Sequence, residues 1–275
     1  MYPEKFLTSI KKISENVVTV SCAFKVLNRL DVGNRMSLIN CDGQVVVFSP
    51  IKYGDYFQEA LKLLGASNIA YIVVVNCEHN VAAKEYAENY PEAKVVCGEG
   101  FAPNQKWKPD FVFNKEAGNR LLNDYLLEEH FSFEWPASLE ILYLKYLKNK
   151  ELVLYETESK TLFVGDILLN IGTVGENGFE QYSPATGYPE KHNPFTGWSY
   201  PLRFIHPRGF LGRYFNQALA NVANPGGEAG IHMIYNKWDF KTIVPCHGNI
   251  ITEYAKEEFK LTFPKVDFTP WELRD

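Results

Sequence analysis

Residues 161–166 read Thr-Leu-Phe-Val-Gly-Asp, a short apolar run that ends on a glycine and an acid. Two other stretches have the same form. Residues 72–79 read Ile-Val-Val-Val-Asn-Cys-Glu-His, and residues 242–248 read Thr-Ile-Val-Pro-Cys-His-Gly. Continuous apolar runs rich in β-branched residues are typical of strands buried on both faces. Each run therefore predicts a buried strand whose last residues lie at the rim of a sheet.

The residues at these three strand ends are ones that metal ions use as ligands. If the strand ends meet, four side chains with nitrogen or oxygen donors would surround one point: Glu78, His79, Asp166 and His247. Four such donors are enough for one zinc or iron ion. Each residue also has a simpler explanation, because acids stabilise helix N-termini and Asp often hydrogen-bonds the backbone at a strand end or turn.

Strands and helices alternate along the chain. In the first half we expect strands at residues 17–21, 35–40, 44–49, 69–75 and 94–97, and helices at 56–64 and 81–90. In the second half we expect a helix at 121–129, strands at 139–144, 151–156 and 161–164, a helix at 231–240 and a strand at 241–245. This order predicts a layered α/β protein with a mixed sheet in each half. No linker divides it, so we expect one domain over residues 1–275.

Residues 170–230 interrupt the alternation. They contain many aromatic residues and prolines with glycines between them, including Tyr182, Trp198, Phe210 and Tyr214. A segment this long between two strands is either a lid with short helices or an extra packing layer. An apolar pocket beside a metal would suit a hydrophobic substrate.

The composition narrows the range of partners. The formal net charge is −5 and no long block of Lys or Arg is present, which argues against nucleic-acid binding. No apolar stretch approaches the roughly 20 residues of a membrane span, and no secretory signal is visible. The five cysteines are scattered and never form a CxxC pair, which favours a reducing compartment. We expect a cytoplasmic protein with a small-molecule substrate, no nucleic-acid partner and no membrane partner; the oligomeric state stays open.

The three stretches resemble the metal motifs of the metallo-β-lactamase-fold superfamily. In that family the first motif is His-x-His-x-Asp-His, followed by a helix and commonly a Pro-x-Ala-Lys-Val-like strand. Here His79 lies twelve residues before Pro91, which opens Pro-Glu-Ala-Lys-Val. Residues 161–166 resemble the family's TLFxGD segment, whose aspartate bridges two metals, and residues 244–248 resemble its last motif, a strand ending in His-Gly. The resemblance implies a four-layer αββα sandwich, with residues 170–230 as an insertion before the last motif.

The family's first metal position is not preserved in this chain. Aligned on His79, the two earlier histidines of the family fall on Val74 and Asn76, and residues 143–155 contain no histidine. Asn76 is a poor substitute for a zinc-binding histidine but could donate a hydrogen bond to a substrate oxygen. The second position retains an acid in place of the family's aspartate, two histidines and the bridging aspartate: Glu78, His79, His247 and Asp166. The resemblance thus implies one metal site with four ligands.

By this resemblance the chain would be a metal-dependent hydrolase of an ester, thioester, lactone or amide bond. One divalent ion, zinc first and iron second, would be enough, because a single metal can polarise a carbonyl and make water more acidic. No catalytic acid or base can be assigned from the sequence. The lost histidines leave open a pseudoenzyme that binds no metal and acts as an interaction module. A non-haem iron oxidoreductase is the third alternative, because branches of the family with carboxylate-rich sites bind iron.

Overall fold

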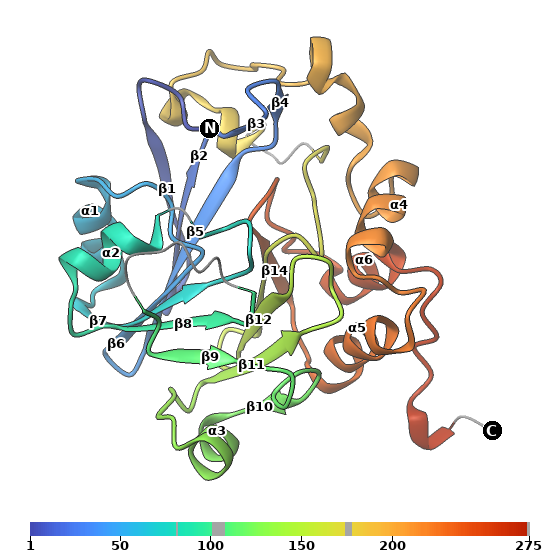
Figure 1. Ribbon diagram of the computed structural model, residues 1–275. Helices are drawn as coiled ribbons and strands as arrows, with labels where there is room; N and C mark the ends of the chain where they lie inside the picture. Colours follow the sequence, from blue (N-terminus) through green and yellow to red (C-terminus); the bar gives the residue numbers. More distant parts are fainter. Residues whose placement is uncertain (81, 101–107, 174–177, 274–275) are drawn as a thin grey trace.

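Two mixed β-sheets form the framework of the protein, for which a computed structural model describes residues 1–80, 82–100, 108–173 and 178–273 (Figure 1). Among these residues the first sheet has seven strands in the order β1-β2-β5-β6-β7-β8-β9, and the second has five in the order β10-β11-β12-β13-β14. A separate two-stranded hairpin is formed by β3 (Lys25–Val26) and β4 (Leu30–Asp31). Strands β6 to β9 run parallel, as do β13 and β14, and the other neighbours are antiparallel.

The strands of the first sheet are β1 (Thr8–Ser14), β2 (Val17–Cys22), β5 (Asn34–Cys41), β6 (Gln44–Phe48), β7 (Asn68–Val74), β8 (Lys94–Gly98) and β9 (Phe111–Phe113). Those of the second sheet are β10 (Leu121–Leu122), β11 (Leu139–Leu144), β12 (Glu151–Glu156), β13 (Thr161–Val164) and β14 (Thr242–Pro245). The helices are α1 (Tyr56–Leu64), α2 (Ala83–Asn89), α3 (Asp124–Phe131), α4 (Phe210–Leu219), α5 (Pro225–Lys237) and α6 (Ala255–Thr262), with short 3-10 turns η1 (Glu180–Tyr182), η2 (Pro184–Thr186), η3 (Gly197–Phe204) and η4 (Trp271–Leu273).

Three buried apolar clusters fix the order of the layers. The first lies between the sheets, where Val73 and Phe48 of one sheet pack with Leu152 and Phe163 of the other. The second joins the outer face of the first sheet to α1 and α2, and includes Phe57 and Tyr86. The third joins the outer face of the second sheet to α5 and α6, as the side chains Ile234 and Phe259 show. The chain is therefore a four-layer αββα sandwich, which confirms the predicted fold class.

Local sequence accounts for several element boundaries. Asp42 and Gly43 both have positive φ, 51° and 86°, as the tight β5–β6 hairpin requires. Gly65 ends α1 in the left-handed region at φ 76°. The expected strands 17–21, 35–40, 69–75 and 94–97 are all present to within about two residues.

Two helices differ from the sequence-based expectation. The helix expected at residues 121–129 starts at Asp124, because Leu121 and Leu122 pair with β11 and the side chain of Asn123 accepts a hydrogen bond from the Leu126 amide. The helix expected at residues 231–240 is α5, which starts earlier, at Pro225, and ends at Lys237, before the expected end. Part of the helix expected at 81–90 falls on Val81, outside the described residues, and the remainder is α2.

Residues 170–230 form short elements, η1, η2, η3 and α4, and then the start of α5. They contain a small apolar cluster of their own, made of Ile171, Phe195, Leu202 and Ile205. Whether they act as a lid stays a prediction, as does the single domain. Within the parts of the chain that the structure describes, no helix is both long enough and apolar enough to cross a membrane.

Candidate metal centre

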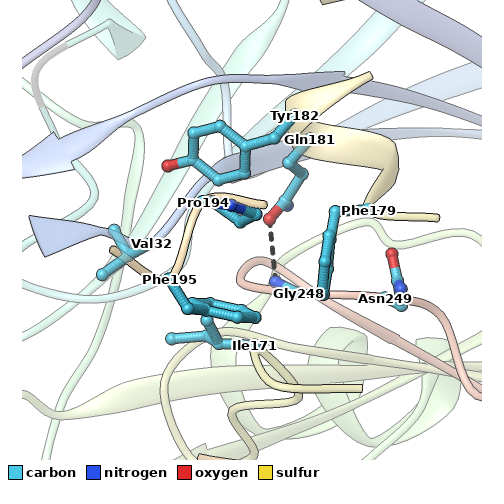
Figure 2. Close-up of a pocket in the computed structure, with 9 residues that line it drawn as sticks. All are labelled: Val32, Ile171, Phe179, Gln181, Tyr182, Pro194, Phe195, Gly248 and Asn249. Atoms are coloured by element: carbon cyan, nitrogen blue, oxygen red, sulfur yellow. Dashed lines mark hydrogen bonds between the residues drawn. The ribbon is translucent and has the colours of Figure 1, made fainter. Parts of the chain in front are cut away.

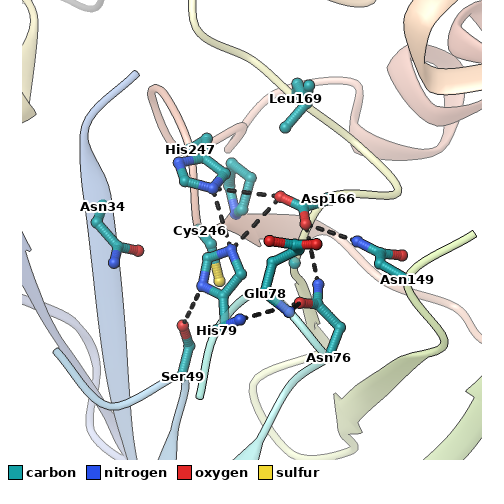
Figure 3. Close-up of polar contacts among 12 residues, drawn as sticks. Asn34, Ser49, Asn76, Glu78, His79, Asn149, Asp166, Leu169, Cys246 and His247 are labelled. Atoms are coloured by element: carbon teal, nitrogen blue, oxygen red, sulfur yellow. Dashed lines mark hydrogen bonds and ion pairs between the residues drawn. The ribbon is translucent and has the colours of Figure 1, made fainter. Parts of the chain in front are cut away.

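The ends of β7, β13 and β14 meet at one rim, as the sequence predicts, and three of the four expected side chains converge there (Figure 3). The Nε2 atoms of His79 and His247 are 3.1 Å apart. Asp166 Oδ1 lies 3.4 Å from His79 Nε2 and 3.2 Å from His247 Nε2. Three electron-rich atoms thus form a nearly equilateral triangle. We call His79, Asp166 and His247 the triad.

The Nδ1 atom of each imidazole contacts a residue beside a strand of the first sheet: Gly33 precedes β5 and Ser49 follows β6. His247 Nδ1 lies 2.7 Å from the carbonyl oxygen of Gly33, which can only accept a hydrogen bond. Nδ1 therefore carries a proton, and Nε2 of His247 faces the other two triad atoms. His79 Nδ1 lies 3.2 Å from Ser49 Oγ. Hydrogen bonds of this kind fix the tautomer and the orientation of metal-binding histidines.

Two amides occupy the other oxygen of Asp166. Asn76 Nδ2 donates to Oδ2 at 3.0 Å and Asn149 Nδ2 donates to the same atom at 2.6 Å. Burial raises the pKa of Asp166, but the charge of His79 and the hydrogen bonds from both imidazoles outweigh it and hold that pKa well below its usual range. Asp166 is therefore an ionised carboxylate with one oxygen toward the triad centre and one toward the amides.

Glu151, the first residue of β12, supports the segment that carries Asp166. Its buried carboxyl group accepts hydrogen bonds from the amides of Gly165 at 2.7 Å, Asp166 at 2.7 Å and Ile167 at 3.2 Å. Burial and repulsion from Asp166 raise the pKa of Glu151 to about 8. A Cβ on Gly165 would lie 2.5 Å from Val75 Cγ1 and 2.8 Å from Glu151 Oε2, so only glycine fits between them.

Arg35 on β5 holds the turn that presents His247. Its side chain is fully buried, and Nη1 donates to the carbonyl oxygens of Pro245 at 2.6 Å and Gly248 at 2.7 Å. Gly248 has φ 89°, and a Cβ there would lie 1.9 Å from the Asn170 carbonyl oxygen. The orientation of His247 is therefore fixed from both sides.

Glu78, the fourth expected ligand, is exposed, and no ligand atom of it joins the triad group, whose atoms all lie within 4.8 Å of one another. The reason is local. Asn76 Oδ1 accepts from the amides of both Glu78 and His79, at 2.9 and 3.2 Å, and this turn directs His79 into the triad. The amide group of Asn76 is bonded to Asp166 and lies 3.4 Å from Glu151, so it is not free for a substrate oxygen as the sequence suggested.

The triad has the dimensions of a metal site. Donors about 2.0–2.1 Å from a tetrahedral zinc ion are separated by about 3.3 Å, close to the 3.1, 3.4 and 3.2 Å that separate the triad atoms. Two imidazoles with one carboxylate form the donor set of a catalytic zinc site with one open position, and also that of non-haem iron. The residues present therefore fit one divalent ion.

A small cavity lies behind the His247 turn, between Gly248 and the η1 segment (Figure 2). Its volume is about 10 Å³, and its walls include Ile171, Phe179 and Phe195. Gln181 Oε1 crosses it to accept from the Gly248 amide at 2.8 Å. This space is at most enough for one water molecule, so it is a packing gap and not a substrate pocket.

The architecture is shared with solved structures. The metallo-beta-lactamase from Hirschia baltica matches with a TM-score of 0.57 over 94% of this chain and 99% of that chain, at 13% identity. The metallo-beta-lactamase from Pontibacter korlensis matches with a TM-score of 0.54 over 93% and 98%, at 14% identity. This chain has the metallo-β-lactamase fold. The resemblance inferred from the sequence motifs is confirmed at the level of the fold.

A third matched structure is the metal-soaked Flv1 flavodiiron core from Synechocystis, with a TM-score of 0.50 over 93% of this chain and 59% of that chain, at 14% identity. No family model and no curated protein matches the sequence. At these identities the comparisons establish the fold, and the chemistry has to be argued from the residues of this chain.

Sequence reasoning missed the residues that support the triad of this metallo-β-lactamase fold. They are Gly33, Arg35, Ser49, Asn149 and Glu151. One signal was available, because Glu151 and Arg35 are charged residues at the start of predicted strands, and both become buried. A buried charge needs a partner, which makes such positions candidates for a site.

Proposed function

We propose that this chain is a mononuclear metal-dependent hydrolase that acts on an ester, thioester, lactone or amide bond of a small molecule. The observation that carries the proposal is the triangle of His79 Nε2, Asp166 Oδ1 and His247 Nε2, with sides of 3.1, 3.2 and 3.4 Å. Electron-rich atoms that face one another at such distances need a cation or shared protons between them. The donor set and the fold both favour a divalent ion.

A divalent ion held by the triad would supply Lewis acidity, which polarises a carbonyl group and makes water more acidic. The residues of the chain prepare for that role. Asp166 stays ionised and supplies negative charge at the centre. Gly33 and Ser49 hold both imidazoles, so their Nε2 atoms need no reorientation before binding.

The hydrogen bonds of Asp166 on the side away from the triad centre favour a single ion. The second carboxylate oxygen of Asp166, Oδ2, already accepts hydrogen bonds from Asn76 and Asn149, so it is not free for a second ion. Amide N–H groups repel a cation and neutralise part of the carboxylate charge. The same pair explains how Asp166 remains ordered without a second ion.

The test combines metal content with turnover. Protein purified without added metal is analysed for zinc and iron and assayed on a phenyl ester, an acyl thioester, a lactone and a β-lactam. We expect one ion per chain and hydrolysis of at least one of these, with both lost in His247→Ala and retained in the control His130→Ala, whose histidine is half-exposed on α3. Metal in the wild type without turnover of any of them contradicts hydrolysis, and unchanged metal in His247→Ala contradicts the site.

Two alternatives have specific support. A proton shared between His79 and His247 would also explain the 3.1 Å contact, and a protein that purifies without metal would then be an interaction module. Two histidines and one carboxylate are also the ligand set of non-haem iron oxygenases, so stoichiometric iron would favour redox chemistry. The free state of all five cysteines supports our further proposal of a cytoplasmic location.

A further inference from the structure

Three neighbouring elements outside the triad expose apolar side chains to solvent. They are the β3–β4 hairpin, η3 and α4, which lie along one edge of the molecule (Figure 1). Leu27 at the hairpin tip is 82% exposed, Trp198 is 71% exposed and Tyr214 is 68% exposed. We call this the aromatic face, defined by six exposed residues: Leu27, Trp198, Tyr200, Phe210, Tyr214 and Phe215. Single exposed apolar residues are normal, but a group of this kind marks an interaction surface.

The aromatic face is held together as a unit. Ser199 Oγ donates to the Arg29 carbonyl at 3.2 Å and accepts from the Asp31 amide at 2.9 Å, which ties η3 to the hairpin. Leu27 keeps its exposed position although its φ is 51°, a conformation that disfavours leucine. An exposed leucine in such a turn does not stabilise the isolated fold.

The charge of this region opposes that of the whole protein. Residues 191–227 contain no Asp or Glu, and one Lys and three Arg give them a charge of +4 in a chain of net charge −5. The Arg29 guanidinium lies 5.4 Å from the Trp198 ring centre, and that of Arg203 lies 5.2 Å from Tyr200. Two acids that contact this region are paired, Asp31 with Lys25 and Glu258 with Arg208, so Arg208 itself adds no net charge.

We propose that the aromatic face docks on an anionic membrane surface. Trp, Tyr and Phe side chains favour the interface between headgroups and acyl chains, and arginines beside them favour lipid phosphates. A second copy of this chain is a poorer occupant, because two such faces would bring like charges together. The proposal replaces the sequence-based expectation of no membrane partner, which rested on the lack of a span; a peripheral surface needs none.

The number of arginines on the aromatic face sets the expected change in vesicle binding. Each arginine near an anionic surface contributes about 1 kcal/mol, which is roughly a fivefold change in partitioning. Arg203→Gln with Arg213→Gln should therefore weaken binding to anionic vesicles about 25-fold. Added salt should weaken the wild type in the same direction, because the lipid charges become screened.

The experiment is co-sedimentation of the full chain with vesicles of phosphatidylcholine alone and of phosphatidylcholine mixed with phosphatidylserine. We expect binding to the mixed vesicles only, strongly reduced in Arg203→Gln/Arg213→Gln and in Phe210→Ala/Tyr214→Ala. The matched control is Arg120→Gln/Tyr125→Ala, which changes an exposed arginine just before β10 and an exposed tyrosine on α3 and should bind as the wild type does. Circular dichroism confirms that each variant is folded.

A fluorescence measurement locates the contact. Trp198 emission should shift to the blue on addition of the mixed vesicles, and the shift should disappear in Trp198→Phe. Any of three results overturns the proposal. The first is no sedimentation with anionic vesicles, and the second is equal binding by the face and control variants. The third is that the aromatic face is needed for self-association, or for binding to an acidic protein, while vesicles do not bind.

Discussion

Replacement of Glu151 by glutamine tests whether this carboxyl group supports the triad. Oε1 accepts from the Gly165 amide, and Oε2 accepts from the amides of Asp166 and Ile167. A protonated carboxyl keeps acceptor capacity on both oxygens, but a glutamine NH₂ group does not. In either orientation the glutamine leaves at least one buried amide without an acceptor, which costs about 1–3 kcal/mol.

Urea unfolding of the metal-free protein measures this effect. We expect Glu151→Gln to lower the free energy of unfolding by about 1–3 kcal/mol and Glu151→Ala to lower it by more, because alanine leaves all three amides unpaired. The control Glu253→Gln changes an exposed acid and should stay within about 0.5 kcal/mol of the wild type. If Glu151→Gln is equally close to the wild type, Glu151 does not hold the Asp166 segment and our explanation of the site geometry is wrong.

Three further predictions follow from the same contacts. The pKa of Glu151 is raised to about 8 from 4.5, so in this pH range the folded state holds a proton that the unfolded state releases. The metal-free wild type should therefore lose stability as pH rises from about 4.5 to 8. Urea titrations at several pH values should show a flatter dependence of stability on pH in Glu151→Gln, and parallel slopes would contradict this. Gly248→Ala should destabilise the fold by more than about 1–2 kcal/mol, the cost of a left-handed residue alone, since its Cβ would lie 1.9 Å from a carbonyl oxygen; a thermal midpoint equal to that of the wild type would refute this. Arg35→Met should leave two carbonyl groups unpaired, which costs about 1–3 kcal/mol of stability each. It should also lower metal affinity, measured in competition with a chelator dye, and an unchanged affinity would show that the His247 turn needs no support from β5.

The sequence predicted the elements whose signals are local. The Asp42-Gly43 hairpin, the Gly65 stop of α1 and the three strand ends of the triad all depend on residues next to one another. His79, Asp166 and His247 converge because the carboxyl ends of β7, β13 and β14 reach the same rim. The order of metal motifs therefore carried more information than any single residue.

The sequence-based predictions failed where tertiary contacts determine the structure. The start of α5 reads Pro-Gly-Gly-Glu-Ala-Gly, which is typical of a loop, yet a Cβ at Gly230 would lie 2.5 Å from Leu144 Cδ2, so close packing of the helix on β11 requires glycine there. Glu151 is bonded to amides 14 to 16 residues further along the chain, and no local pattern reports such a contact. Glu78 and His79 are adjacent, and only the Asn76 turn determines which of them faces the triad.

The most direct test of the central claim is a crystal structure of the full chain grown with zinc, with diffraction recorded on both sides of the zinc absorption edge. We predict a single anomalous peak at the centre of the triangle formed by His79 Nε2, Asp166 Oδ1 and His247 Nε2. A peak elsewhere, two peaks flanking Asp166, or none at full zinc occupancy in solution would contradict the mononuclear site.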